Sequence, residues 1–190
     1  MNSIIDKIVN PFYYLKDHQL IVFGLLGASV FILVGWTTGT HFLGIFHVAL
    51  AKGYHLKIHA IEYGVFFGSL FVVSYVLSAT LAKRVPRPID FLSTVLICSI
   101  PILIPILMRF LDVFSSFIRL SYYHSVIRIT VAMAEIAMIW WLYCGIKIGA
   151  NLKPTQAKIV VVLSIVISEA FMVFIIPRIS QLIFIYHALL

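Results

Sequence analysis

The sequence predicts an all-α polytopic membrane protein, a bundle of five transmembrane helices with a short interfacial N-terminal helix. Hydrophobic residues make up 62% of the 190 residues, charged residues only 11%, and the mean hydropathy is +1.08. Soluble domains are roughly half apolar and about a quarter charged, so this composition excludes that class. The apolar residues form five long runs, separated by short segments that hold most of the bases.

Each apolar run is long enough to cross the membrane, since about 20 helical residues span about 30 Å of hydrocarbon. We expect residues 1–190 to form a single membrane domain with spans at 20–37, 60–82, 91–110, 127–150 and 159–176. The tail from Ile179 to Leu190 is too short for a sixth span. Pro101 and Pro105 lie one turn apart in the third span and predict a kink there.

Apolar residues also recur near helical spacing before the first span, among charged residues between Ile4 and Leu15. This pattern predicts an interfacial helix within residues 1–18, interrupted at Asn10-Pro11. A simple lead-in to the first span fits the pattern equally well. The N-terminus lacks a basic n-region and a cleavage site, so we expect the first span to be retained.

The bases between the spans predict the orientation of the chain. Six of them fall in two segments without an acid, after the second and fourth spans: Lys83, Arg84, Arg87, Lys147, Lys153 and Lys158. The positive-inside rule places both segments in the cytoplasm, with the N-terminus inside and the C-terminus outside a bacterial cytoplasmic membrane. Three bases in the outer segments make this bias moderate. The net charge of +7 is spread over the loops, so no nucleic-acid partner is expected.

Two carboxylates lie about halfway along predicted spans, Glu135 in the fourth and Glu169 in the fifth. An ionised carboxylate in hydrocarbon costs about 3 kcal/mol, so each requires a partner, a proton or water. Arg109 and Arg128 are the cations that could pair with Glu135. These four residues form a candidate intramembrane polar site, which serves either a structural pairing or the transport of protons or ions.

A second candidate site lies near the start of the second span. His55, His59 and Glu62 are spaced i, i+4 and i+7, which places them on one face of a helix. Two imidazoles and a carboxylate could bind a divalent metal such as zinc, with water or His41 completing the shell. No glutamate follows His55, so the metalloprotease motif HExxH is absent. An interfacial helix that faces lipid headgroups is the alternative.

Pairs of glycines on two spans predict close helix packing. Gly64 and Gly68 in the second span, and Gly145 and Gly149 in the fourth, have the GxxxG spacing. Small residues let helix backbones approach, so we expect packing seams inside the bundle, or a homo-oligomer formed through these faces. No Walker lysine loop and no GxSxG motif occurs, and no catalytic residue is predicted.

Two short motifs carry a family resemblance. Asn10-Pro11-Phe12 precedes the first span, and Gly39-Thr40-His41-Phe42 follows it. With the rhythm of five spans, they resemble the bacterial branch of the Yip1 family over nearly the whole chain. The resemblance implies a compact five-helix membrane bundle with a cytoplasmic N-terminus. Eukaryotic relatives resemble adaptors for small GTPases, but the longer cytoplasmic segment and DLYGP-type motif involved are missing here.

The function favoured by the sequence is that of a non-enzymatic membrane protein that scaffolds or modulates a membrane partner, such as a transporter. It rests on the short loops, the packing glycines and the missing catalytic motifs. One alternative is a small proton- or ion-coupled transporter that uses Glu135 and Glu169. The other is a metal-binding membrane protein that uses the face formed by His55, His59 and Glu62.

Overall fold

The computed structural model describes residues 10–13, 15–42, 45, 48–50, 56–114 and 121–188. This part of the chain is mainly helical and contains five segments long and apolar enough to cross a membrane, as the all-α prediction requires. They are α2 (Asp17–Thr38), α3 (Leu56–Leu81), a broken segment made of α4 (Pro88–Cys98), η2 (Ile100–Ile102) and α5 (Leu103–Phe114), α6 (Ser121–Gly149), and α7 (Pro154–Ala188).

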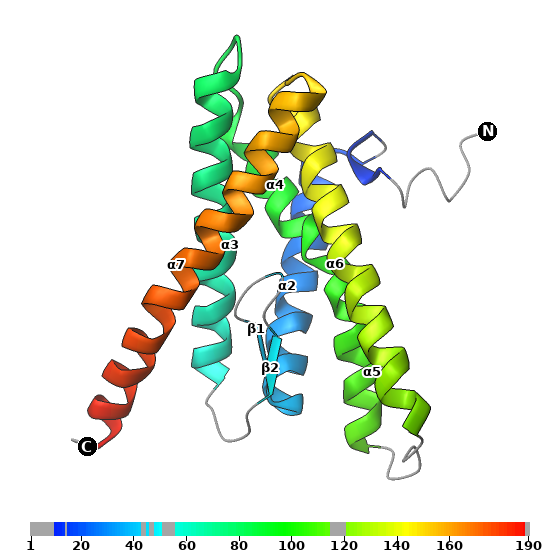
Figure 1. Cartoon of the computed structure of the whole chain (residues 1–190), viewed down its shortest axis with the longest axis vertical. Helices are drawn as coiled ribbons and strands as arrows, with labels where there is room; N and C mark the ends of the chain where they lie inside the picture. Colours follow the sequence, from blue (N-terminus) through cyan, green and yellow to red (C-terminus); the bar gives the residue numbers. More distant parts are fainter. Residues whose placement is uncertain are drawn as a thin grey trace.

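The helices run along the long axis of the molecule (Figure 1). α7 packs along α3, α4 lies between α2 and α6, and α5 continues downward beside α6. The α3–α4 and α6–α7 connections lie at one end of the bundle, the same end as the 3-10 turn η1 (Pro11–Tyr13). The end of α2, the start of α3 and the end of α7 lie toward the other end. The bases of the two connections therefore gather at a single end.

The third span is interrupted at its prolines, as predicted. α4 ends at Cys98, and the 3-10 turn Ile100–Ile102 contains Pro101. Proline has no backbone N–H and clashes with the preceding turn, so an α-helix cannot continue through it without distortion. Pro105 falls in the first turn of α5, where a missing N–H leaves no helical hydrogen bond unmade.

The predictions for the two ends of the chain have different outcomes. The interfacial helix expected within residues 1–18 falls largely outside the described residues, and its described part holds only the 3-10 turn η1 (Pro11–Tyr13) and the start of α2. The Gln19 side chain accepts a hydrogen bond from the Lys16 backbone N–H at 3.0 Å, which marks the start of α2. At the other end, the residues after Ile179 continue α7 as far as Ala188.

The glycine pairs behave differently from one another. A Cβ atom at Gly145 would collide with Thr94 of α4, and one at Gly149 would lie 3.0 Å from the Cβ of Asp90. This pair forms the predicted seam inside the bundle. Around Gly64 and Gly68, no neighbouring atom of the described residues lies within 4 Å of an added Cβ, so the prediction of a second internal seam was wrong for this part of the chain. Their face of α3 is turned away from the described remainder of the chain.

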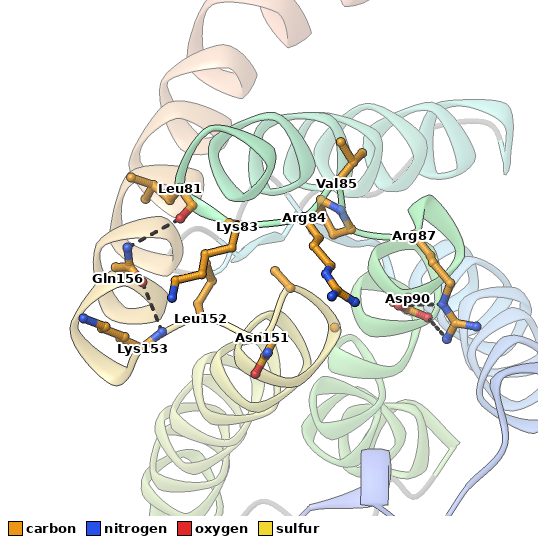
Figure 2. A pocket seen from close by; sticks show the side chains of 14 residues that line it. Leu81, Lys83, Arg84, Val85, Arg87, Asp90, Asn151, Leu152, Lys153 and Gln156 are labelled. Carbon is orange, nitrogen blue, oxygen red and sulfur yellow. Dashed lines mark hydrogen bonds and ion pairs between the residues drawn. The ribbon is translucent and has the colours of Figure 1, made fainter.

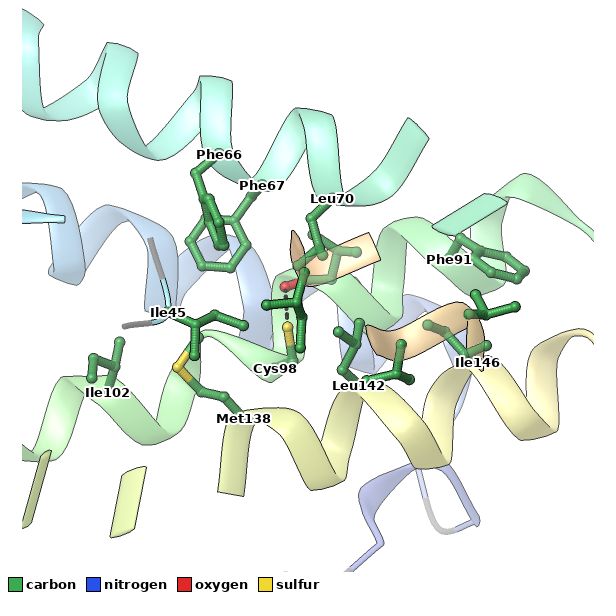
Figure 3. Close-up of a cluster of buried hydrophobic side chains, with 14 of the residues drawn as sticks. Ile45, Phe66, Phe67, Leu70, Phe91, Cys98, Ile102, Met138, Leu142 and Ile146 are labelled. Carbon is green, nitrogen blue, oxygen red and sulfur yellow. Dashed lines mark hydrogen bonds between the residues drawn. The ribbon is translucent and has the colours of Figure 1, made fainter. Parts of the chain in front are cut away.

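The core lies between α3, α4, α6 and α7. Figure 3 shows Phe66 and Leu70 of α3 above Met138 and Leu142 of α6, and all four side chains are fully buried. Ile45 lies among them, although it belongs to the connection between α2 and α3. Ile45 therefore brings its part of the connection into the core.

Replacement of Gly145 by alanine tests the α4–α6 seam. The added methyl group would overlap the Thr94 side chain, and overpacking of this kind costs typically 1–3 kcal/mol. We expect Gly145→Ala to lower the thermal unfolding midpoint in detergent. The control, Gly68→Ala, adds the same methyl group in open space and should match or exceed the wild-type midpoint, because alanine favours helix over glycine by about 1 kcal/mol. Equal midpoints for the two variants would contradict the seam.

Candidate metal centre

The site begins where α2 stops. Gly39 has a φ of 65°, in the left-handed region that favours glycine, and its backbone N–H points at the carbonyls of Gly35 and Trp36. The chain then turns back as β1 (Thr40–Phe42), which pairs antiparallel with β2 (Val48–Leu50). Figure 1 shows this hairpin beside α2 and α3, among the helices. Sequence reasoning missed the hairpin, although Gly39 after an apolar run is a signal for a helix end.

Ile45, between the two strands, anchors the hairpin. Its exposed fraction is 0%, and it packs with Phe66 of α3 and Met138 of α6 in the hydrophobic core. The close packing of Ile45 against these two side chains therefore holds the hairpin in place. That anchor fixes the position of the neighbouring strand β1, which carries His41.

Three polar side chains meet between β1 and the first two turns of α3. The Nδ1 atom of His41 lies 2.9 Å and 3.0 Å from the two carboxylate oxygens of Glu62. The rings of His41 and His59 stack with centroids 4.3 Å apart. One ligand atom from each of the three residues lies within 4.8 Å of the others. We refer to His41, His59 and Glu62 as the histidine–glutamate cluster.

All members of the cluster are buried, with exposed fractions of 4–5%. A buried carboxylate is costly unless it is paired and hydrogen-bonded. Glu62 meets this requirement by accepting from the His41 ring, and the His59 ring hydrogen-bonds to the backbone carbonyl of Thr40. The cluster thus joins the hairpin to α3 through polar contacts inside an apolar bundle.

A missing side chain on α2 makes room for the cluster. A Cβ atom at Gly35 would lie 3.1 Å from the Thr40 carbonyl oxygen and 3.8 Å from Nδ1 of His59. Any larger residue would therefore push against the carbonyl that His59 binds. The hydroxyls of Thr38 and Thr40 lie 2.8 Å apart and form a hydrogen bond at this end of α2.

The hydrogen bond to Glu62 also fixes the chemistry of His41. The Glu62 carboxylate can only accept, so Nδ1–H of the His41 ring is the donor. A zinc ion held between the three side chains would take the place of this proton and bind Nδ1 together with a Glu62 oxygen. Two histidines and a glutamate form a three-ligand set for zinc that leaves a fourth position open.

The structure places the predicted metal ligands as follows. His59 and Glu62 lie three residues apart on α3, and His41 reaches them from the hairpin. His55, the fourth residue of the predicted set, lies outside the described residues. His41 was expected to complete the shell of a helical face, and it is instead the residue with the closest contact to Glu62.

The predicted intramembrane polar site is spread over three helices. Glu135 on α6 and Glu169 on α7 each lie about four turns from the short connection between these helices, so they stand at matching depth. Both are half-buried, and Glu169 acts electrostatically on Glu135. Arg128 is exposed and forms no ion pair among the described residues, whereas the side chain of Arg109 on α5 lies outside the described part.

The link between His41 and Glu62 can be measured with a double-mutant cycle. We expect His41→Ala and Glu62→Gln each to destabilise the protein in detergent, and the pair to show a coupling energy of about 1–3 kcal/mol. A cycle between His18→Ala, at an exposed position of α2, and Glu62→Gln should give no coupling. Coupling of the same size in both cycles would show that the contact has no specific role in holding the hairpin.

Comparisons with known proteins give no match to this chain: no family model, no curated protein and no solved structure is similar to it. The resemblance to the Yip1 family accordingly stays a prediction.

Proposed function

We propose that this chain is a multi-pass membrane protein that binds a divalent transition-metal ion, zinc by the chemistry of the ligands, at the histidine–glutamate cluster. The single observation that supports the proposal most is the convergence of His41, His59 and Glu62 within 4.8 Å, all buried. Clustered imidazole and carboxylate groups at this depth have few other partners, and zinc accepts this combination of ligands.

The geometry requires only a small rearrangement for metal binding. Tetrahedral zinc with ligands at about 2.0–2.1 Å holds its ligand atoms about 3.3 Å apart. The ligand atoms of the cluster lie within 4.8 Å of one another, so a side-chain movement of about 1 Å brings them to that spacing. Water is the simplest fourth ligand, and His55 is a further candidate from its position in the sequence.

Metal content of the purified protein tests the proposal. We expect wild-type protein in detergent to retain about one zinc ion per chain by elemental analysis, and His59→Ala and Glu62→Gln to weaken zinc affinity at least 100-fold, because loss of an outer-shell partner alone costs 10–100-fold. The cobalt-substituted protein should lose its tetrahedral visible absorption in the same variants.

His18→Ala is the matched control, since it removes an exposed imidazole from α2. It should leave zinc content and cobalt spectrum unchanged. Glu62→Gln keeps the shape of the side chain and guards against a variant that loses metal by unfolding, which circular dichroism would reveal. Full zinc affinity in folded Glu62→Gln and His59→Ala protein would refute the metal site.

Transport is a second candidate function, favoured by the matched depth of Glu135 and Glu169 and by the electrostatic interaction between their side chains. Two carboxylates on neighbouring helices can share a proton or a cation. Near Glu169, the hydroxyls of Ser164 and Ser168 are buried without a hydrogen-bond partner in the described structure. These hydroxyls are available to water or to a cation beside α7.

Neutral amide variants distinguish transport from a structural role. If the pair relays protons or coordinates a cation, Glu135→Gln and Glu169→Gln should abolish ion flux into liposomes while the thermal midpoint stays near that of the wild type, because the amide preserves shape and removes titration. Asp17→Asn, which neutralises a carboxylate at the end of the bundle, should transport normally. Wild-type flux in both glutamate variants would reject transport through this pair.

The distribution of bases supports an orientation of the chain in the membrane. The bases gathered at the end that carries the α3–α4 and α6–α7 connections favour a cytoplasmic location for that end, with the N-terminus inside a bacterial cytoplasmic membrane. A scaffold role toward another membrane protein, or self-association through the open face of Gly64 and Gly68, stays a prediction from the sequence.

A further inference from the structure

A basic pocket lies at the end of the bundle opposite to the histidine–glutamate cluster. It has a volume of about 640 Å³ and lies between the α3–α4 and α6–α7 connections. Its charged lining consists of Lys83, Arg84, Arg87, Lys153 and Asp90. Figure 2 shows the side chains of Lys83 and Arg84 reaching from the α3–α4 connection toward the α6–α7 connection.

Three of the four basic side chains that line the pocket have no acidic partner among the described residues. Arg87 donates to Asp90 at 2.6 Å and to Asp17 at 3.1 Å, and hydrogen bonding to Asp90, followed by the attraction of both carboxylates, raises the pKa of Arg87 further. Asp90, the only carboxylate among the described lining residues, is thereby neutralised. The side chains of Lys83, Arg84 and Lys153 form no ion pair with any described residue. The pocket therefore carries an excess of positive charge that an anion can balance.

The walls of the pocket are held in place. Asn151 has a φ of 49°, and the backbone N–H of Leu152 donates to the Lys147 carbonyl at 3.1 Å, the hydrogen bond that closes a Schellman motif at the end of α6. Gln156 accepts from the Lys153 backbone N–H at 3.1 Å and contacts the Leu81 carbonyl at 3.5 Å, so it ties the two connections together. The two connections are therefore already ordered before an anion binds, which reduces the loss of conformational entropy on binding.

The rim of the pocket is apolar. Two of the lining residues are apolar and open to the surroundings: Val85 is 78% exposed and Leu81 is 39% exposed. The pocket lies at the ends of α3, α4, α6 and α7, the level at which lipid headgroups surround a membrane protein. A ligand that combines a phosphate with hydrocarbon would satisfy both the bases and these apolar side chains. A free phosphate ion would satisfy the bases only.

We propose that this pocket binds the phosphate of an anionic phospholipid headgroup, with Lys83, Arg84 and Lys153 contacting the phosphate and Leu81 and Val85 contacting the lipid chains. The proposal is independent of the metal centre, which lies at the other end of α3. Pockets formed by basic side chains on the cytoplasmic side of membrane helices suit headgroups of this charge.

Lipid titrations on the full chain test the proposal. The protein in neutral detergent is titrated with phosphatidylglycerol, phosphatidylcholine and inorganic phosphate, and binding is followed by native mass spectrometry. We expect phosphatidylglycerol to bind preferentially. The double variant Lys83→Gln, Arg84→Gln should bind it about 30-fold more weakly, because each base near an anionic surface contributes about fivefold.

The matched control removes two bases far from the pocket, Lys57→Gln with Arg128→Gln, both exposed. It lowers the net charge equally and should keep wild-type affinity for phosphatidylglycerol. Equal losses in the two double variants, or phosphatidylcholine binding as tightly as phosphatidylglycerol, would overturn the proposal. Inorganic phosphate that displaces phosphatidylglycerol at equal concentration would overturn the assignment to a lipid and identify a site for the free ion.

Discussion

The buried contact between His41 and Glu62 is the interaction on which the interior of this bundle depends. A chain that leaves the helical path among membrane helices must find internal partners for its backbone polar groups, because hydrocarbon offers none. The hairpin after α2 meets this condition through its own strand pairing and through the hydrogen bond of His59 to Thr40. The Glu62 carboxylate accepts a hydrogen bond from the His41 ring, so the hairpin and α3 each provide a partner for a buried polar side chain of the other.

The insertion of the hairpin gives the protein two ends with different chemistry. One end has a buried cluster of two histidines and a glutamate, formed by a short strand and the first turns of α3. The other end has exposed bases on two short connections. One of these bases, Arg87, forms hydrogen-bonded ion pairs with Asp17 and Asp90. A metal ion suits the first environment and a lipid phosphate the second, and between them the glutamates of α6 and α7 stand at a common depth.

The packing of small residues decides which helices approach closely. Gly24 and Gly145 both lie against α4, so α4 is held between α2 and α6. The third span, which begins with α4, has the largest share of buried residues among the five spans. Two glycines with the same spacing on α3 touch nothing in the described structure. GxxxG spacing alone therefore does not indicate whether a face packs inside the bundle; the arrangement of the neighbouring helices decides this.

The sequence by itself determined the class of the protein and the course of its helices. Long apolar runs have one low-energy structure in a bilayer, and Pro101 broke the third span for a local reason, its missing N–H. The histidine and glutamate spacing on α3 was also readable, because helical periodicity is local. Only the tertiary structure brought His41 to Glu62, since that contact crosses 21 residues and depends on the burial of Ile45. Contacts of this kind depend on how a turn packs into the core, which no local pattern in the chain encodes.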